Sequence, residues 1–210
     1  AGSMDLNGNV AISGVGNSYS AIYAESGKIN VNVVKEETGK VIGSGNHDVT
    51  IAGNIIAVHK PDMESEINLG LATGNSKLTG IIYNAFEEAP VTYSRMAATN
   101  TMVTSNANGT GGVNLWLKNG ATWTNEQQGN LPANLNDSFS GSYVNNLVGG
   151  SNYNHAGIIH QKDGHDLNVD QYSGSTLVWY DHENSGDDVA DYKAGNTVIK
   201  NASEGAYIRL

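Results

Sequence analysis

The sequence contains no cysteine, which excludes disulfides, thiolate nucleophiles and zinc–thiolate centres. Proline occurs only 3 times, and charged residues make up 15% of the chain, against roughly 25% in average soluble domains. No stretch approaches the about 20 apolar residues that a membrane-spanning helix needs. Few stretches have the Ala, Leu, Glu and Lys content of a helical bundle. A chain of 210 residues has room for one domain or one run of repeats.

Basic residues are also scarce. The chain has 11 Lys and Arg against 21 Asp and Glu, and its formal net charge is −10. Binding to a phosphate backbone depends on clustered Lys and Arg, and the sequence has no such cluster. We therefore expect neither nucleic acid nor an anionic lipid surface as a partner.

The sequence is rich in turn-forming residues. Gly, Asn and Ser occur 26, 27 and 18 times, about a third of the chain. Between turn clusters, apolar and polar residues alternate with period two over four to six residues, which is typical of β-strands. The clearest alternations lie at residues 28–34, 48–53, 66–71, 112–117 and 166–170. The chain is therefore predicted to be all-β.

Internal similarity separates a β-sandwich from a β-solenoid. Residues 24–31 resemble residues 202–210, and Gly174–Tyr180 matches Gly195–Asn201 at a spacing of 21 residues. That spacing suits one coil of a parallel β-helix, so we predict a stack of roughly ten coils of about 20 residues.

A β-helix of this kind predicts where particular residues lie. Aliphatic side chains should stack inside as columns, while Gly and Asn occupy sharp corners with a left-handed backbone. Asn side chains should also form hydrogen-bonded ladders between coils. The residues expected in the inner columns are Val31, Ile51, Leu69, Leu115, Val169 and Leu177.

Residues 111–124, GGVNLWLKNGATWT, resemble a motif of pertactin-type autotransporter passengers, in which an aliphatic strand leads to Asn-Gly-Ala-x-Trp. Residues 142–151, 165–182 and 195–210 resemble the elements that follow it in that family. The resemblance covers residues 111–210 and implies a right-handed parallel β-helix. It also implies a location on the outer membrane of a Gram-negative bacterium, reached through a C-terminal translocator barrel in the parent chain. The usual work of such passengers is adhesion.

The expected organisation has four parts. Residues 1–4, Ala-Gly-Ser-Met, resemble a cloning remnant, and residues 5–59 and 109–210 are expected to be β-helix coils. Residues 60–108 hold two of the three prolines and three of the four methionines. This segment is predicted to be either irregular coils or an inserted loop or lobe. The whole chain is interpreted as a fragment of a longer passenger.

Enzymatic chemistry has few candidates in the sequence. No Gly-Asp-Ser-Gly nucleophile elbow of a serine-protease passenger is present. A polysaccharide-acting β-helix enzyme would need converging carboxylates, and the richest acidic cluster lies in a turn-like stretch. There it indicates solvated surface, or a weak cation site. The cluster consists of Asp181, Glu183, Asp187, Asp188 and Asp191.

Histidine and tryptophan residues offer two further possibilities. His160 and His165 could share a metal only across the Asp163–Gly164 turn, and a polar corner is the preferred interpretation. Trp123 and Trp179 are expected in structural positions, with a sugar-stacking platform as the alternative for the tryptophans, Trp116 included. No cofactor and no metal are expected.

The predicted function is that of a non-catalytic adhesin, anchored at the cell surface. Its partners would be copies of itself on neighbouring cells, as in a biofilm, or a host matrix protein or glycan. The alternatives are a polysaccharide-acting enzyme and a purely structural stalk. A partner site is expected in the irregular segment, at Asp62, Glu64, Glu66, Glu87, Glu88, Tyr93 and Arg95.

Overall fold

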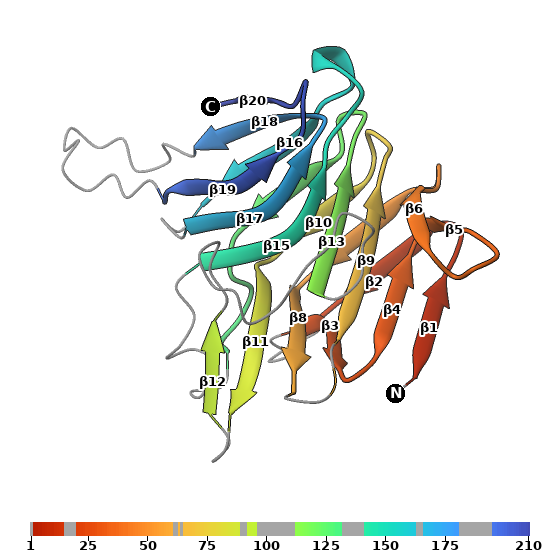
Figure 1. Cartoon of the computed structure of the whole chain (residues 1–210), viewed down its shortest axis with the longest axis vertical. Helices are drawn as coiled ribbons and strands as arrows, with labels where there is room; N and C mark the ends of the chain where they lie inside the picture. Colours follow the sequence, from red (N-terminus) through yellow and green to blue (C-terminus); the bar gives the residue numbers. More distant parts are fainter. Residues whose placement is uncertain are drawn as a thin grey trace.

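The computed structural model describes residues 2–14, 20–60, 63, 65–88, 92–95, 112–131, 141–162, 166–180 and 195–210. For residues 86–88 and 92–95 it describes the backbone alone. The described chain is all-β, and its larger sheets are built from parallel strands (Figure 1). The prediction of an all-β chain is therefore confirmed.

Two seven-stranded parallel sheets form most of the molecule. Sheet A contains, in spatial order, β1 (Ser3–Leu6), β4 (Lys28–Val31), β9 (Glu66–Leu71), β13 (Gly112–Leu117), β15 (Gly141–Val148), β17 (Asp166–Ser173) and β19 (Thr197–Ala202). Sheet B contains β2 (Val10–Ser13), β7 (Val49–Ala52), β10 (Lys77–Thr79), β14 (Thr122–Asn125), β16 (Gly157–Gln161), β18 (Ser175–Tyr180) and β20 (Tyr207–Arg209). In both sheets the spatial order is the chain order, because the chain alternates between them.

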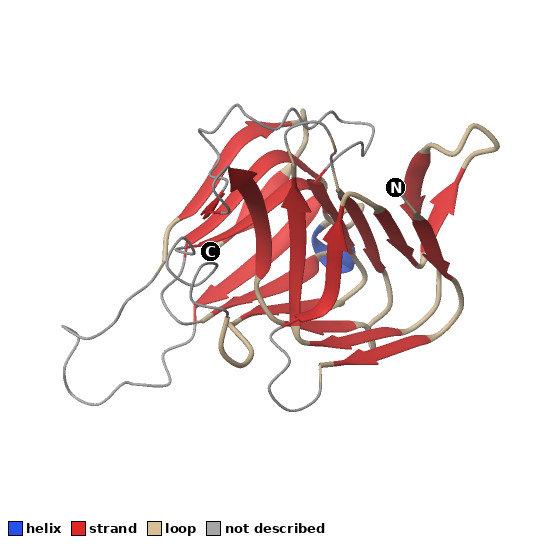
Figure 2. Cartoon of the chain, turned by 90° about the horizontal axis from the view of Figure 1, so that it is seen from below, coloured by secondary structure: helices blue, strands red, loops and turns tan. Residues whose placement is uncertain are grey.

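A third sheet closes the N-terminal part. Sheet C has the order β12 (Thr92–Arg95), β11 (Ile82–Glu88), β8 (Asn54–His59) and β3 (Ser20–Glu25). The first three coils therefore pass through A, B and C in turn, and the strands surround a common interior (Figure 2). An antiparallel hairpin of β5 (Val33–Lys35) and β6 (Val41–Ser44) is inserted between β4 and β7. This path is consistent with a β-solenoid.

The interior is filled by in-register aliphatic columns. In sheet A, Val31, Leu69, Leu115 and Leu147 lie opposite one another in successive strands, and each is at most 1% exposed. Such continuous burial supplies the hydrophobic free energy that a chain without disulfides requires. Of the six predicted column residues, five belong to the core. The prediction for Leu177 is wrong, because its neighbour Val178 faces the core and Leu177 faces outward.

The predicted repeat of 21 residues is also wrong. Residues 174–180 contribute β18 to sheet B, whereas residues 195–201 contribute β19 to sheet A. Strand β19 stacks on β17, with Leu167 opposite Thr197, and β20 stacks on β18. The true spacing between stacked positions varies from 19 residues (Ile158 to Leu177) to 46 (Glu66 to Gly112). Sheet A accordingly has seven strands in the described chain, not roughly ten.

Several corners use the backbone conformation that was predicted. Asn32 and Asn119 have φ of 50° and 56°, in the left-handed region that Asn tolerates better than most residues. The Asn32 side chain also donates to the carbonyl oxygens of Gly45 (3.1 Å), His47 (3.2 Å) and Gly70 (3.0 Å). One Asn therefore fixes both the corner and the start of the β5–β6 hairpin.

The segment of residues 60–108 begins as an ordinary coil. Strands β9, β10 and β11 pair in parallel with the strands of the preceding coil. The departure comes with β12, which pairs antiparallel with β11. Residues 96–108 lie outside the described chain. Among the described residues, no helix has the length and apolar character to cross a membrane.

Candidate functional site

In their central strands, the two large sheets differ in how far their outer faces are buried. In β9 and β13 of sheet A every residue is buried, so both faces of these strands are covered. In sheet B, burial alternates along β7, β14 and β16, so one face is covered and the other is accessible. This contrast separates a structural face from a face that a partner can reach.

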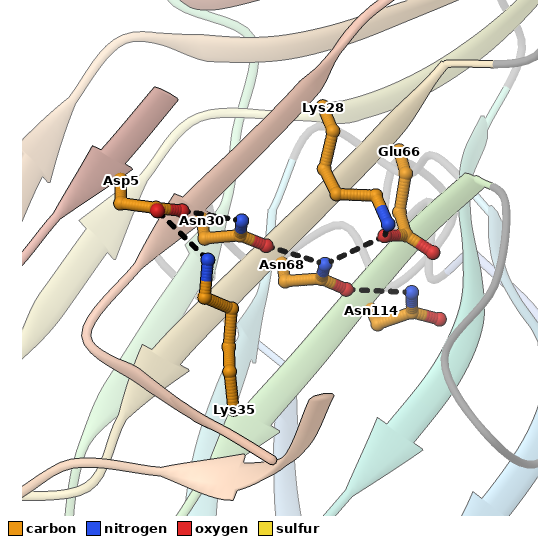
Figure 3. Close-up of polar contacts among 7 residues, drawn as sticks. All are labelled: Asp5, Lys28, Asn30, Lys35, Glu66, Asn68 and Asn114. Atoms are coloured by element: carbon orange, nitrogen blue, oxygen red, sulfur yellow. Dashed lines mark hydrogen bonds and ion pairs between the residues drawn. The ribbon is translucent and has the colours of Figure 1, made fainter. Parts of the chain in front are cut away.

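The outer face of sheet A carries a ladder of side-chain amides (Figure 3). The ladder consists of Asp5, Asn30, Asn68, Asn114 and Asn146, which lie in register in five successive strands. Each Asn donates from Nδ2 to the side-chain oxygen of the preceding coil. The four donor–acceptor distances run 2.7, 2.8, 2.8 and 2.6 Å from the Asp5 end. The predicted Asn ladder between coils is confirmed.

Charged residues hold the N-terminal end of the ladder. Asp5 accepts from Asn30 and forms an ion pair with Lys35 Nζ at 2.7 Å. The hydrogen bond from Lys35 is the largest cause that lowers the pKa of Asp5, followed by the one from Asn30. In the neighbouring column Glu66 binds Lys28 at 2.9 Å and accepts from Asn68 at 3.0 Å. The ladder therefore begins at a carboxylate that is held ionised.

The buried outer face of sheet A also contains Tyr143, which is 1% exposed. Burial raises the pKa of its hydroxyl group, and the nearby charge of Asp170 raises it further. Asp170 lies 4.0 Å from Lys200 Nζ. Burial raises the pKa of Tyr172 as well, whose hydroxyl group donates to the carbonyl oxygen of Tyr207. These groups contribute to stability in their neutral state.

The outer face of sheet B is open along all seven strands. It displays two side chains from each strand, and each of them is partly or fully exposed. They are Ala11, Ser13, Thr50, Ala52, Lys77, Thr79, Thr122, Thr124, Ile158, His160, Leu177, Trp179, Tyr207 and Arg209. We define these residues as the open face. It is the candidate functional site of the described chain.

The tryptophans divide between the two environments. Trp123 is fully buried in the core and donates from Nε1 to the carbonyl oxygen of Gly80 at 2.8 Å, so its predicted structural position is confirmed. Trp116 is 6% exposed and lies opposite Gly70 on the outer side of sheet A. The structural interpretation of Trp179 is wrong, because Trp179 is 51% exposed on the open face. Its ring contacts the ring of His160, with centroids 4.9 Å apart.

Sequence reasoning missed the role of His59. This side chain is fully buried at the end of β8, where its Nδ1 accepts from the Ser65 backbone N–H at 3.3 Å. Its Nε2 therefore carries the proton and donates to Asn84 Oδ1 at 2.8 Å. Asn84 in turn donates to the carbonyl oxygen of Tyr143 at 2.8 Å. A single histidine at the end of an apolar strand gave no periodic signal for this link between coils.

The other predicted site residues are placed as follows. Glu66 is only 6% exposed and is held by Lys28 and Asn68 in the ladder, so its carboxylate does not present itself to a partner. The backbones of Glu87, Glu88, Tyr93 and Arg95 lie in β11 and β12, and their side chains are outside the description. Asp62 and Glu64 lie outside the described residues. So do Asp181, Glu183, Asp187, Asp188 and Asp191, together with His165.

The described residues contain no group of three or more His, Asp or Glu side chains arranged to hold a metal ion. Comparison with known proteins gives no relatives: no family model, no curated protein and no solved structure matches the chain.

Proposed function

We propose that this chain is a segment of a right-handed parallel β-helix and works as a non-catalytic adhesin. In this proposal it belongs to the exported passenger of a pertactin-like autotransporter, displayed on the outer surface of a Gram-negative bacterium. It would attach the cell to neighbouring cells through copies of itself, or to a host matrix protein or glycan. The observation that carries the proposal is the open face, which runs unbroken across seven stacked strands of sheet B.

The fold supports this proposal because it makes a rigid, extended display. Strands that stack in register with buried aliphatic columns and an amide ladder hold neighbouring coils at fixed spacing, near 4.8 Å per strand. Side chains on the open face therefore form regular rows that need little ordering when a partner binds. A pre-organised surface loses less conformational entropy on binding than a flexible one does.

The composition of the open face supports contact by many weak interactions. Threonine hydroxyl groups at Thr50, Thr79, Thr122 and Thr124 can donate and accept hydrogen bonds. Small side chains such as Ala52 project little from the N-terminal half of the face, so a partner can approach the sheet closely. Contacts of this type are weak one by one. They become strong when many copies on one cell engage together, because each further contact is effectively intramolecular.

An aggregation assay with defined surface variants tests this function. The purified 210-residue chain is coupled to beads, and the same chain is displayed on a non-adhesive bacterium. Clumping of beads and attachment of cells to matrix-coated plates are then measured. The informative variant is T79E/T124E, which places two carboxylates in one row of the open face. The matched control is T38E, at the exposed tip of the β5–β6 hairpin.

Adhesion is expected for the wild-type chain and for T38E, and it should be lost in T79E/T124E, whose circular dichroism spectrum should stay unchanged. Clumping of beads would show self-association, whereas attachment to matrix alone would show binding to a host surface. If wild-type beads neither clump nor attach, the adhesin function of this segment is refuted and a stalk is the better description. Equal adhesion by T79E/T124E and T38E would move the contact away from the open face.

A further inference from the structure

Exposed aromatic side chains collect at one end of the open face. Trp179 is 51% exposed, Tyr207 is 42% exposed, and Tyr153, in the short helix η1 (Tyr153–His155) beside β20, is 49% exposed. At the N-terminal end the same face carries only Ala, Ser, Thr and Lys. Large exposed aromatic rings contribute nothing to the core, and their clustering marks a binding surface.

Neighbouring side chains hold these rings in place. The rings of Tyr153 and Tyr207 meet edge to face, with centroids 6.1 Å apart and planes at 82°. Arg209 donates from Nη1 to the Tyr153 hydroxyl oxygen at 3.2 Å. On the adjoining strands, the ring of Trp179 packs against the ring of His160 at an interplanar angle of 50°. The rings are therefore oriented before any ligand arrives, which lowers the entropy cost of binding.

The register of the strands fixes the shape of this cluster. Leu177 lies opposite Ile158 on one side and Arg209 on the other, so one row crosses three strands and consists of two apolar side chains and a guanidinium group. Tyr207 precedes this row by two residues and Trp179 follows it by two. At about 3.3 Å per residue, the two aromatic positions are roughly 13 Å apart along the strand direction. An extended ligand is required to touch both.

The charge of the open face differs from that of the chain as a whole. Its basic side chains are Lys77, His160 and Arg209, and none of its fourteen residues is Asp or Glu. The whole chain carries a net charge of −10. Arg209 has five N–H donors, in a geometry that matches a carboxylate, and the hydrogen bond to Tyr153 uses only one of its nitrogens. The face is therefore complementary to an anionic ligand.

We propose that this end of the open face binds an extended oligosaccharide containing uronic acid residues. The C–H faces of the sugar rings pack on Trp179 and Tyr207, and a sugar carboxylate pairs with Arg209. Aromatic platforms combined with a few directional polar groups suit carbohydrates, because each sugar ring has an apolar face and a polar rim. The inference assigns a ligand class to the proposed adhesin. The role of this binding in adhesion rests on the proposed function, whereas the binding itself is argued from the surface alone.

Tryptophan fluorescence tests this site directly. Trp116 and Trp123 are 6% and 0% exposed, so Trp179 is the tryptophan that acrylamide quenches from solvent. The probes are tetragalacturonic acid, and cellotetraose as a neutral oligomer of the same length. Tetragalacturonic acid should bind, shield Trp179 from acrylamide and bind at least about tenfold more tightly than cellotetraose.

Variants separate the contributions of the ring and the charge. W179A should weaken binding of tetragalacturonic acid by about tenfold, measured by calorimetry, whereas W179F, which keeps a ring, should retain most of it. R209A should remove the preference for the acidic oligomer, and T50A, at the other end of the face, should bind as wild type does. Circular dichroism establishes that each variant is folded.

Two results would overturn the inference: no saturable binding of either oligomer, or unchanged binding in W179A. Equal affinity for both oligomers would overturn the assignment of an acidic ligand. The assay involves no cells and no clumping, so its failure is distinguishable from failure of the adhesin function. A chain that clumps but binds neither oligomer is an adhesin without this site, and a chain that binds but does not clump keeps the site without self-association.

Discussion

Sheets A and B are built from the same coils, yet their outer faces have opposite properties. In the central strands of sheet A the outer face is covered, and it includes Asn residues that satisfy one another. The outer face of sheet B is accessible, and its positions vary from Ala and Thr to Trp and Arg. A covered polar face must supply a partner for every donor and acceptor, because each unsatisfied group is costly. An accessible face has water as its partner, so its residues are free to serve recognition.

The largest expected effect of a single substitution is in the middle of the ladder. N68A removes the partner of the Asn114 amide and of the Asn30 carbonyl oxygen, all of them nearly or fully buried. Each orphaned group costs about 1–3 kcal/mol, so we expect a loss of about 3 kcal/mol in the free energy of unfolding. Urea unfolding followed by tryptophan fluorescence measures it.

The matched control on sheet B is T124A. Thr124 lies on the open face, where truncation is expected to change stability by less than about 0.5 kcal/mol. Similar losses in both variants would contradict the distinction between a self-satisfied face and a solvated one.

The next largest effect is expected from G70A, at the point where the β5–β6 hairpin approaches sheet A closely. At Gly70 an added Cβ would overlap the carbonyl oxygen of Asn32 and lie 2.7 Å from Ser44 Cβ. We expect G70A to cost about 2 kcal/mol, in the range of overpacking substitutions, and to loosen the hairpin. Faster limited proteolysis near Glu36–Lys40 would report the loosening. The control A52V adds volume to the open face and should leave proteolysis unchanged.

High pH should destabilise the fold through ionisation of Tyr143, which is buried in sheet A. The folded-state pKa of Tyr143 is raised, so its contribution to stability is complete below the ordinary Tyr value near 10 and is lost as the pH rises above it. The wild-type chain should therefore lose stability as the pH rises from about 10 to about 11.5. Y143F should flatten this slope, while Y207F, at an exposed position, should leave it as it is. Identical slopes in all three proteins would refute the assignment.

The smallest expected effect is at the acidic end of the ladder. The folded-state pKa of Asp5 is lowered, so its contribution is present above the ordinary Asp value near 3.9 and is lost as the pH falls below it. Asp5 and Lys35 are 39% and 35% exposed, and solvent screens their pair, so a few tenths of a kcal/mol are at stake. D5N should reduce the decline of the unfolding midpoint between pH 5 and 3. An unchanged decline would assign it to other carboxylates.

The sequence predicted those features that depend on local pattern. Period-two alternation identified strands such as β4, β7, β9, β13 and β17, and five of the six inner-column residues belong to the core. The abundance of Asn predicted both the ladder and the left-handed corners at Asn32 and Asn119. These features depend on the spacing of side chains along one strand and on the backbone preferences of single residues, so the local sequence is enough to predict them.

The features that the sequence did not predict depend on which strand stacks on which. Coil lengths vary from 19 to 46 residues, so a fixed spacing in the sequence does not identify the strands that stack. The match between residues 174–180 and 195–201 therefore placed two strands of different sheets in one column. Leu177 and Trp179 are apolar residues on an accessible face, and alternation alone assigns apolar residues to the core. The side of β18 that faces inward is fixed only by its pairing with β16, whose Ile159 lies opposite Val178.

The amide ladder has a direction, because all four Asn side chains donate toward the N-terminal coil, and Asn30, Asn68 and Asn114 each accept from the next coil. Its amide dipoles are therefore aligned head to tail, as peptide dipoles are in an α-helix, and hydrogen bonds in such a chain polarise one another. The positive end of this array points at Asp5. The Asp5 carboxylate lies at the positive end of the ladder, just as an acidic residue in the first turn lies at the positive end of a helix dipole. The strand backbones contribute little dipole along the direction in which the coils stack. The aligned side-chain amides therefore give the molecule an electrostatic polarity along that axis.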